Sequence, residues 1–225
     1  MDKEKLTKLY NSILQAPVTY LLVLINIIVF VVCEINGDTT DGDYMLEAGA
    51  MCPYMVIHYG QSYRLFTCLF LHFGIEHLFY NMLLLFVLGQ IFEKAVGLTR
   101  FVAIYFASGL SGSFLSFLFL ELSGQVYNIA AGASGAIFGV AGGMLVVILV
   151  HKGKYAGITT RRMLLMVVVT LLCGFTTAGT DNIGHIGGVL MGSILTFLCY
   201  GIPVLIEFRR EKQYTLDKSI EDEGE

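Results

Sequence analysis

Long apolar runs are the feature that most limits how this chain can fold. A helix needs about 20 mainly apolar residues to cross the hydrocarbon core of a bilayer. Six runs reach or approach that length, the fifth being short, and they lie at 17–35, 76–92, 100–122, 132–150, 162–175 and 182–206. We therefore expect an all-α, polytopic membrane protein with six transmembrane helices.

The composition agrees with a surface that faces lipid. Hydrophobic residues make up 56% of the chain and charged residues 14%, whereas a soluble domain carries about 25% charged residues. No basic patch is interleaved with aromatic residues, so nucleic acid is not an expected partner. The five cysteines are scattered without CxxC or metal-type spacing, and we expect no metal and no cofactor.

Lysine and arginine residues predict the orientation, because cytoplasmic loops hold an excess of them. With both termini inside, every one of the 14 basic residues except Arg64 falls on the cytoplasmic side. We expect a cytoplasmic segment at 1–16, a six-span domain at 17–207 and a charged cytoplasmic tail at 208–225, mobile toward its end. The lack of a targeting peptide favours a bacterial plasma membrane.

The long connection at 36–75 is expected to lie at the membrane interface. It mixes Met, Tyr, Phe and Leu with few charges and includes the run LFTCLFL at 65–71. That composition is too apolar for a solvated loop and too interrupted for a span. An interfacial, partly embedded helical segment fits best.

Four polar side chains share one depth in the predicted bundle. The second, fourth and sixth spans all begin on the outer side, and His77, Asn81, Ser134 and His185 lie within about two turns of those starts. Ionisable groups inside a span are costly and tend to mark function. Taken singly, each could instead be structural, with His77 and Asn81 serving as hydrogen-bonding glue between helices. Their common depth favours a single site.

Two glycine series support the same grouping. Each steps by four residues, one along the fourth span and one along the sixth: Gly135, Gly139 and Gly143, and Gly184, Gly188 and Gly192. Such stripes let helix backbones approach closely in lipid. If the stripes face each other, Ser134 and His185 come close enough to share a proton. The alternative is that both are packing seams that face other helices.

Four short motifs occur in order along these spans. They are GxSG at 132–135, HxxG at 185–188, H-x4-H-x3-N at His72, His77 and Asn81, and the pair Tyr63–Arg64 in the first loop. Together they resemble the motifs of the rhomboid family of intramembrane serine proteases, from roughly the first span to the sixth. That family has a Trp-Arg pair where this chain has Tyr63–Arg64. The resemblance implies a rhomboid-like bundle with an interfacial first loop.

The resemblance also implies roles for individual residues. Ser134 would be the nucleophile and His185 the general base, without the usual carboxylate. An oxyanion hole would be formed by His77, Asn81 and the backbone N–H of Ser134.

Other residues would support this site by the same resemblance. They are Gly132, Gly135, Gly188 and His72 within the motifs, Arg64 as the residue that shapes the first loop, and Phe138 as the ring packed on the catalytic imidazole. The nearby acid Asp181 is expected to cap the sixth helix rather than orient the imidazole.

The resulting hypothesis is an intramembrane serine endopeptidase that hydrolyses peptide bonds of other membrane proteins near the outer ends of their spans. Water must reach Ser134, so we expect a polar cavity among the second, fourth and sixth spans. Substrate is expected to enter near the fifth span and the loop at 178–181. Two alternatives remain: a catalytically inactive rhomboid-like binding factor, and a small transporter or channel, although the chain lacks an obvious repeat or a Pro-broken central helix.

Overall fold

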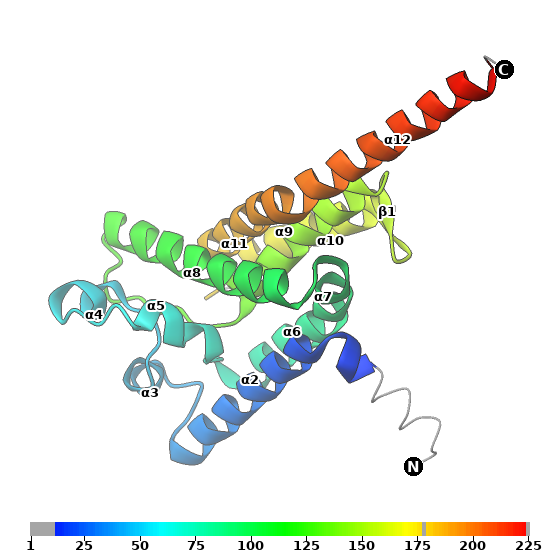
Figure 1. Cartoon of the computed structure of the whole chain (residues 1–225). Coiled ribbons are helices and arrows are strands. Elements are labelled where there is room, and N and C mark those ends of the chain that lie inside the picture. Colours follow the sequence, from blue (N-terminus) through cyan, green and yellow to red (C-terminus); the bar gives the residue numbers. More distant parts are fainter. Residues whose placement is uncertain (1–11, 177–178, 224–225) are drawn as a thin grey trace, which may run out of the picture.

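Helices account for almost all of the described chain, which is residues 12–176 and 179–223 of this computed structural model. The two-stranded sheet in these residues is a hairpin of β1 (Lys154–Tyr155) and β2 (Ile158–Thr159). The expected all-α class is therefore confirmed, with this small hairpin added (Figure 1). The residues Lys3, Lys5 and Lys8 of the predicted N-terminal segment lie outside the described residues.

Four helices in the described residues are long and apolar enough to cross a membrane. Two are α2 (Pro17–Asn36) and α8 (Leu98–Leu122). The third combines α6 (Gly74–Leu84), the π-helical turn η2 (Leu85–Gly89) and α7 (Gln90–Val96). The fourth combines α11 (Asn182–Thr196), the π-helical turn η3 (Phe197–Gly201) and the start of α12 (Ile202–Glu223). The chain is thus an integral, multi-pass membrane protein.

Two shorter helices occupy the positions predicted for the fourth and fifth spans. They are α9 (Ser134–Val150) and α10 (Thr160–Thr176), with 17 residues each. Helix α9 is apolar on all sides and almost entirely buried, as expected of a helix surrounded by other helices. Its start differs from the prediction, because Gly132 has a φ of 137° and belongs to the preceding loop. Helix α10 begins two residues earlier than predicted.

The long first connection folds into short helical segments. They are α3 (Gly42–Glu47), α4 (Pro53–His58), α5 (Arg64–Thr67) and the 3-10 turn η1 (Cys68–Phe70), which gather on one side of the bundle in Figure 1. The connection is fixed to the loop before α9, since the N–H groups of Met51 and Ala130 each donate to the other's carbonyl at 2.9 Å. Gly132 N–H also donates to Cys68 O at 2.9 Å.

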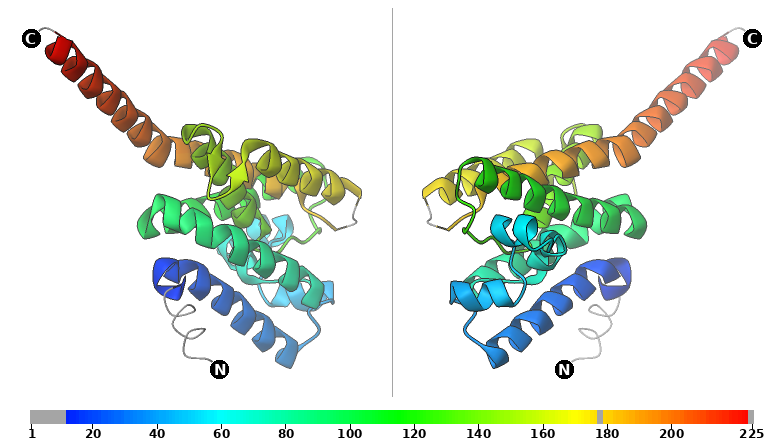
Figure 2. Two further views of the ribbon diagram at one scale, coloured as in Figure 1. Left: turned by 90° about the vertical axis from the view of Figure 1, so that its right-hand side faces the viewer. Right: turned by 90° about the vertical axis from the view of Figure 1, so that its left-hand side faces the viewer.

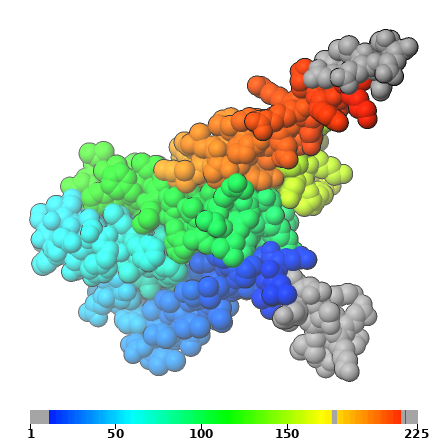
Figure 3. All heavy atoms as spheres, viewed as in Figure 1, coloured from blue at the N-terminus to red at the C-terminus, as the bar shows by residue number. Residues whose placement is uncertain are grey.

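The C-terminal tail, predicted to be charged and mobile, is helical. Helix α12 continues to Glu223 and stands clear of the bundle in Figures 2 and 3. Beyond Pro203 the tail contains no glycine or proline as far as Glu223 and is rich in Glu, Lys, Arg and Leu, which are good helix formers.

An acidic side chain of α7 holds the start of α2. The Glu93 carboxylate accepts hydrogen bonds from the N–H groups of Val18 and Thr19 at 3.0 and 2.8 Å, and from Thr19 Oγ1 at 2.7 Å. The first N–H groups of a helix have no partner within the helix, and the positive end of its dipole favours an anion. Glu93, which is 2% exposed, thus caps a helix far away in the sequence.

Candidate active site

Glycines bring α9 and α11 into backbone contact. A Cβ added to Gly188 would overlap the carbonyl oxygen of Gly135, and one added to Gly192 would overlap the carbonyl oxygen of Gly139. The two predicted stripes therefore face each other at these two levels. Further along α9 the match ends, because Gly143 packs against Phe92 and Thr196 instead.

A third helix joins this contact, which the sequence analysis missed. A Cβ on Gly112 of α8 would lie 2.6 Å from Gly184 O, and one on Gly109 would lie 2.9 Å from the side chain of Leu69. Ser108 of the same helix packs against Gly139. Ser108 and Gly112 are four residues apart, but the series in α8 is not made of glycines alone, which is why it was not recognised from the sequence.

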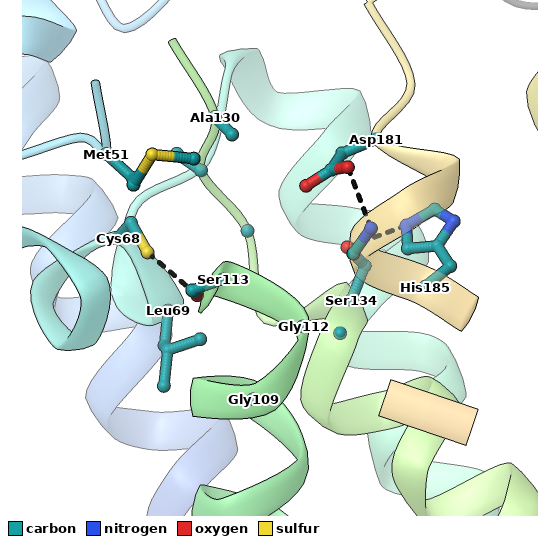
Figure 4. A pocket seen from close by; sticks show the side chains of 14 residues that line it. Met51, Cys68, Leu69, Gly109, Gly112, Ser113, Ala130, Ser134, Asp181 and His185 are labelled. Atoms are coloured by element: carbon teal, nitrogen blue, oxygen red, sulfur yellow. Dashed lines mark hydrogen bonds between the residues drawn. The ribbon is translucent and has the colours of Figure 1, made fainter. Parts of the chain in front are cut away.

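The close packing joins the two central side chains. Ser134 is the first residue of α9, and His185 lies in the first turn of α11. His185 Nε2 and Ser134 Oγ are 2.9 Å apart, which is hydrogen-bond distance (Figure 4). His185 is 8% exposed. A hydroxyl and an imidazole in this arrangement can exchange a proton.

The imidazole of His185 is held by packing rather than by a carboxylate. The Phe138 ring stacks on it with centroids 4.2 Å apart and planes 17° from parallel. His185 Nδ1 is buried and has no hydrogen-bond partner among the described residues. The carboxylate of Asp181 instead accepts from Gly184 N–H at 2.8 Å, which confirms its predicted role as the cap of α11. Burial raises the pKa of the Asp181 carboxyl, while the Gly184 and Ser116 hydrogen bonds oppose the shift.

His77 lies next to the loop that leads into Ser134. Its Nδ1 accepts from Phe73 N–H at 3.3 Å, which leaves the proton on Nε2. A Cβ added to Gly132 would lie 3.0 Å from that Nε2 and 3.5 Å from Ser134 Oγ. The imidazole therefore reaches the edge of the site, and a side chain at residue 132 would collide with it.

Asn81 is on the same helix but its amide is engaged elsewhere. Its Nδ2 donates to the carbonyl oxygen of His77 at 2.9 Å, within α6, and the residue is 5% exposed. No hydrogen bond joins Asn81 to Ser134 or His185 within the described part of the chain. The structure therefore brings His77 to the site and leaves Asn81 one helical turn further along α6.

His72 packs against His77 and the loop that leads into Ser134. Its ring contacts that of His77 at 5.2 Å, and its Nε2 accepts a long 3.5 Å bond from Ala133 N–H. The side chain is 1% exposed. Burial, and then the neighbouring His77, lower the pKa of His72 to about 3, so this imidazole is neutral at ordinary pH.

Arg64 is buried in the first loop and does not lie at its surface. It is 4% exposed. Its Nη1 donates to the carbonyl oxygens of Leu46 and Ala50 at 2.6 and 2.9 Å, and its Nε donates to Gln61 Oε1 at 2.6 Å. The guanidinium therefore connects three parts of the loop, through geometry that a lysine could not reproduce.

A small cavity of about 30 Å³ opens beside Ser134. Polar groups in its lining include Cys68, Ser113 and Asp181, and Cys68 Sγ lies 3.2 Å from Ser113 Oγ (Figure 4). A space of this size holds a water molecule when polar partners are present. The fourth and sixth spans line this cavity as expected, whereas no residue of the second span, which is described throughout, is in its lining. The lining comes from α8, the first loop, the loop before α9, α9 and the start of α11, because the glycines of α8 bring that helix against the site.

No group of three His, Cys, Asp or Glu side chains in residues 12–176 and 179–223 is arranged to hold a metal ion.

Comparison with known proteins finds a matching family model and similar proteins. The family model of the Rhomboid domain matches residues 59–202. Rhomboid protease GluP of Bacillus subtilis (strain 168) is 36% identical over 185 residues, which covers 82% of this chain and 35% of that protein. RHOMBOID-like protein 2 of Arabidopsis thaliana is 41% identical over 156 residues, covering 68% of this chain and 47% of that protein. The chain spans less than half the length of these two relatives.

Proposed function

Because the chain belongs to the rhomboid family of intramembrane proteases, we propose that it is a serine endopeptidase that cuts other membrane proteins near the outer ends of their transmembrane segments. Ser134 is the nucleophile and His185 the general base. The observation that carries this proposal is the 2.9 Å contact between Ser134 Oγ and His185 Nε2. The similarity to GluP, which is named a rhomboid protease, supports the same reaction.

The reaction follows from these two groups. His185 Nε2 takes the Ser134 proton as Oγ attacks the carbonyl carbon of the substrate, because a serine hydroxyl is a weak nucleophile until a base accepts its proton. The imidazolium then protonates the leaving amine, and an acyl-enzyme remains on Ser134. Water enters next, His185 removes its proton, and hydrolysis restores the hydroxyl. The cavity next to Ser134 can supply that water.

We assign the developing oxyanion to donors around the start of α9. The backbone N–H of Ser134 is one of the unpaired donors in the first turn, where the helix dipole also favours negative charge. His77 Nε2–H, beside Gly132, is the second donor. Asn81 becomes the third if substrate draws its amide from the His77 carbonyl. Each such donor typically contributes about 100- to 1,000-fold in rate.

Packing replaces the missing carboxylate in this proposal. The stacked Phe138 ring fixes the plane of the His185 imidazole with Nε2 toward the serine. Gly135 and Gly188 keep the two helices close enough for the contact. His72 and Gly132 shape the loop that leads into Ser134, and Arg64 organises the first loop.

The topology completes the proposal. We propose six spans, with α9 and α10 as the fourth and fifth, a cytoplasmic N-terminal segment at 1–16, a catalytic domain at 17–207 and a cytoplasmic tail from 208. A 17-residue helix is about 26 Å long, which is close to the hydrocarbon thickness. The distribution of basic residues favours both termini inside and a plasma membrane of bacterial type. Substrate enters beside α10, because most of the large apolar side chains of this helix are exposed to lipid and do not pack against the other helices.

A serine-directed probe tests the proposal without a known substrate. A fluorophosphonate should label the detergent-purified protein, and Ser134→Ala should abolish the label. His185→Ala should slow labelling by about 100-fold or more, because a positioned base contributes that much. Ser123→Ala is the matched control, since this exposed serine at the end of α8 should leave labelling unchanged.

Cleavage of a single-span substrate in detergent completes the test. Equal cleavage by the wild-type protein and Ser134→Ala would end the protease proposal and favour an inactive binding factor. For the oxyanion hole, Asn81→Ala at saturating substrate should lower the turnover number by about 100-fold. An unchanged turnover number would make Asn81 a packing residue only.

A further inference from the structure

A basic groove lies at the opposite end of the bundle from Ser134. It is formed by the β1–β2 hairpin and the start of α10, and its volume is about 530 Å³. Three of its lining residues are cations, and the lining is Lys154, Gly157, Thr159, Arg161, Arg162 and Leu165. No acidic residue is among these described lining residues. The groove is formed by a short hairpin whose register pairs Lys154 with Thr159, directly before α10.

Two of these cations lie at a helix N-terminus, where positive charge is unfavourable. Arg161 and Arg162 are in the first turn of α10, and that turn contains no acidic residue. Cations at a helix N-terminus are repelled by the positive end of the dipole, and here they line the same groove as Lys154. The rule that loops inside the cell are basic accounts for lysine and arginine in this loop. It does not account for their convergence on one hollow at a helix start, where an anion would offset the repulsion.

The groove continues onto a face that suits hydrocarbon. Leu165 forms part of its lining, and Val169 and Leu172 follow at the next turns of α10. These three side chains are 60%, 47% and 60% exposed, so they form an apolar track that leads away from the cations. A soluble phosphate would need only the basic end, whereas a phospholipid uses both.

We propose that this groove binds an anionic phospholipid of the cytoplasmic leaflet. The headgroup phosphate accepts hydrogen bonds from Arg161, Arg162 and Lys154, and an acyl chain lies along Leu165 and beyond. Arginine suits this role because its planar fork matches phosphate oxygens. The site depends on the proposed orientation, with the hairpin inside, but not on catalysis.

Binding would fix the inner end of α10. The buried apolar side chains of this helix, among the described residues, are Met163 and Val167. Both lie in the first two turns, so a lipid held by the first turn would strengthen the attachment of this end of the helix to the bundle. This makes the groove a point at which membrane composition acts on the helix beside which substrate is proposed to enter.

Native mass spectrometry of the full chain tests the site. The Ser134→Ala protein in detergent is offered phosphatidylglycerol and phosphatidylcholine in equal amounts, so that binding is measured separately from proteolysis. It should retain phosphatidylglycerol about tenfold more than phosphatidylcholine. Replacing Lys154, Arg161 and Arg162 with glutamine should remove most of that preference. The control replaces Arg209, Arg210 and Lys212 with glutamine, which removes the same charge from α12 and should keep the preference.

Three outcomes would overturn the proposal. The first is full retention of phosphatidylglycerol by the groove variant, and the second is equal retention of the two lipids by the starting protein. The third is displacement of the lipid by millimolar glycerol 3-phosphate, which would make this a site for a soluble phosphate. If the triple variant does not fold, Arg161→Gln alone carries the test: a loss of about fivefold supports the site and unchanged retention refutes it.

Discussion

Gly188→Ala and Gly135→Ala should have opposite effects on stability, although the two glycines contact each other. A methyl group on Gly188 would meet the carbonyl oxygen of Gly135, an atom that no side-chain rotation can move. On Gly135, the nearest atoms to an added methyl would be Gly184 O at 3.6 Å and Gly112 Cα at 3.7 Å, which is ordinary contact. The sequence assigns both residues to glycine stripes and does not distinguish them.

The expected magnitudes follow from two opposing effects. Overpacking a close contact costs about 1–3 kcal/mol, and we expect the upper end at Gly188 because the obstacle is backbone. Replacing a helical glycine with alanine stabilises the helix by about 1 kcal/mol. The free energy of unfolding should therefore fall by about 2 kcal/mol in Gly188→Ala. It should stay equal or rise by up to about 1 kcal/mol in Gly135→Ala.

Unfolding in mixed micelles with increasing SDS measures both variants against the wild-type protein. Separation of α9 from α11 also lengthens the contact between Ser134 and His185, now 2.9 Å. Labelling of Gly188→Ala by a fluorophosphonate should therefore slow by about 100-fold, as expected for a misplacement near 1 Å. If Gly188→Ala unfolds at the wild-type SDS fraction, the two helices do not approach as described and the argument from glycine packing fails.

Three further predictions concern residues outside this contact. Glu93→Ala should lower the free energy of unfolding by about 2–4 kcal/mol. Hydrogen bonds to a charged group contribute about 1.5–3 kcal/mol each, and in the variant water replaces only part of them. Unfolding in SDS measures the loss, and a value below about 0.5 kcal/mol would refute the cap. Phe138→Ala should lower the turnover number while Phe138→Tyr preserves it, as the ring and not its substituent stacks on His185; equal turnover in all three proteins would contradict this. The pKa of His72 is about 3 in the folded protein and near 6.5 in the unfolded chain. Between these pH values the unfolded state binds more protons, so the free energy of unfolding falls as the pH drops below about 6.5. Thermal unfolding of His72→Asn should therefore depend less on pH between about 7 and 5 than that of the wild-type protein, and parallel curves would exclude this contribution.

The sequence was sufficient to predict the central pair, for a physical reason. Long apolar runs fix the depth of each residue in a membrane, so Ser134 and His185 could be assigned to one level before any contact was known. The stripe of glycines then limited how far apart their helices could be. The cap at Asp181 was equally accessible, because capping is a local interaction between neighbouring residues.

Contacts between distant segments were less accessible. Glu93 follows an apolar run and precedes Lys94, so it resembles an ordinary loop acid until the start of α2 is seen to lie beside it. Ser108, Gly112 and Ser116 of α8 step by four, but a series that is mostly serine is not recognised by its glycines. Gly109 and Gly112 nevertheless decide that the cavity opens toward α8. The Asn81 amide could not be assigned either, because its hydrogen bond to His77 is set by the rotamer.

The contact between Glu93 and the first helix has a consequence for biosynthesis. The backbone N–H of Thr19 donates to the Glu93 carboxylate, which lies 74 residues later in the chain. As the protein emerges from the ribosome, the start of that helix must remain hydrated or bound by headgroups until residue 93 has been made. The first segment can therefore enter the bilayer early, but its N-terminal end reaches its final position only after the following hydrophobic segment has been inserted.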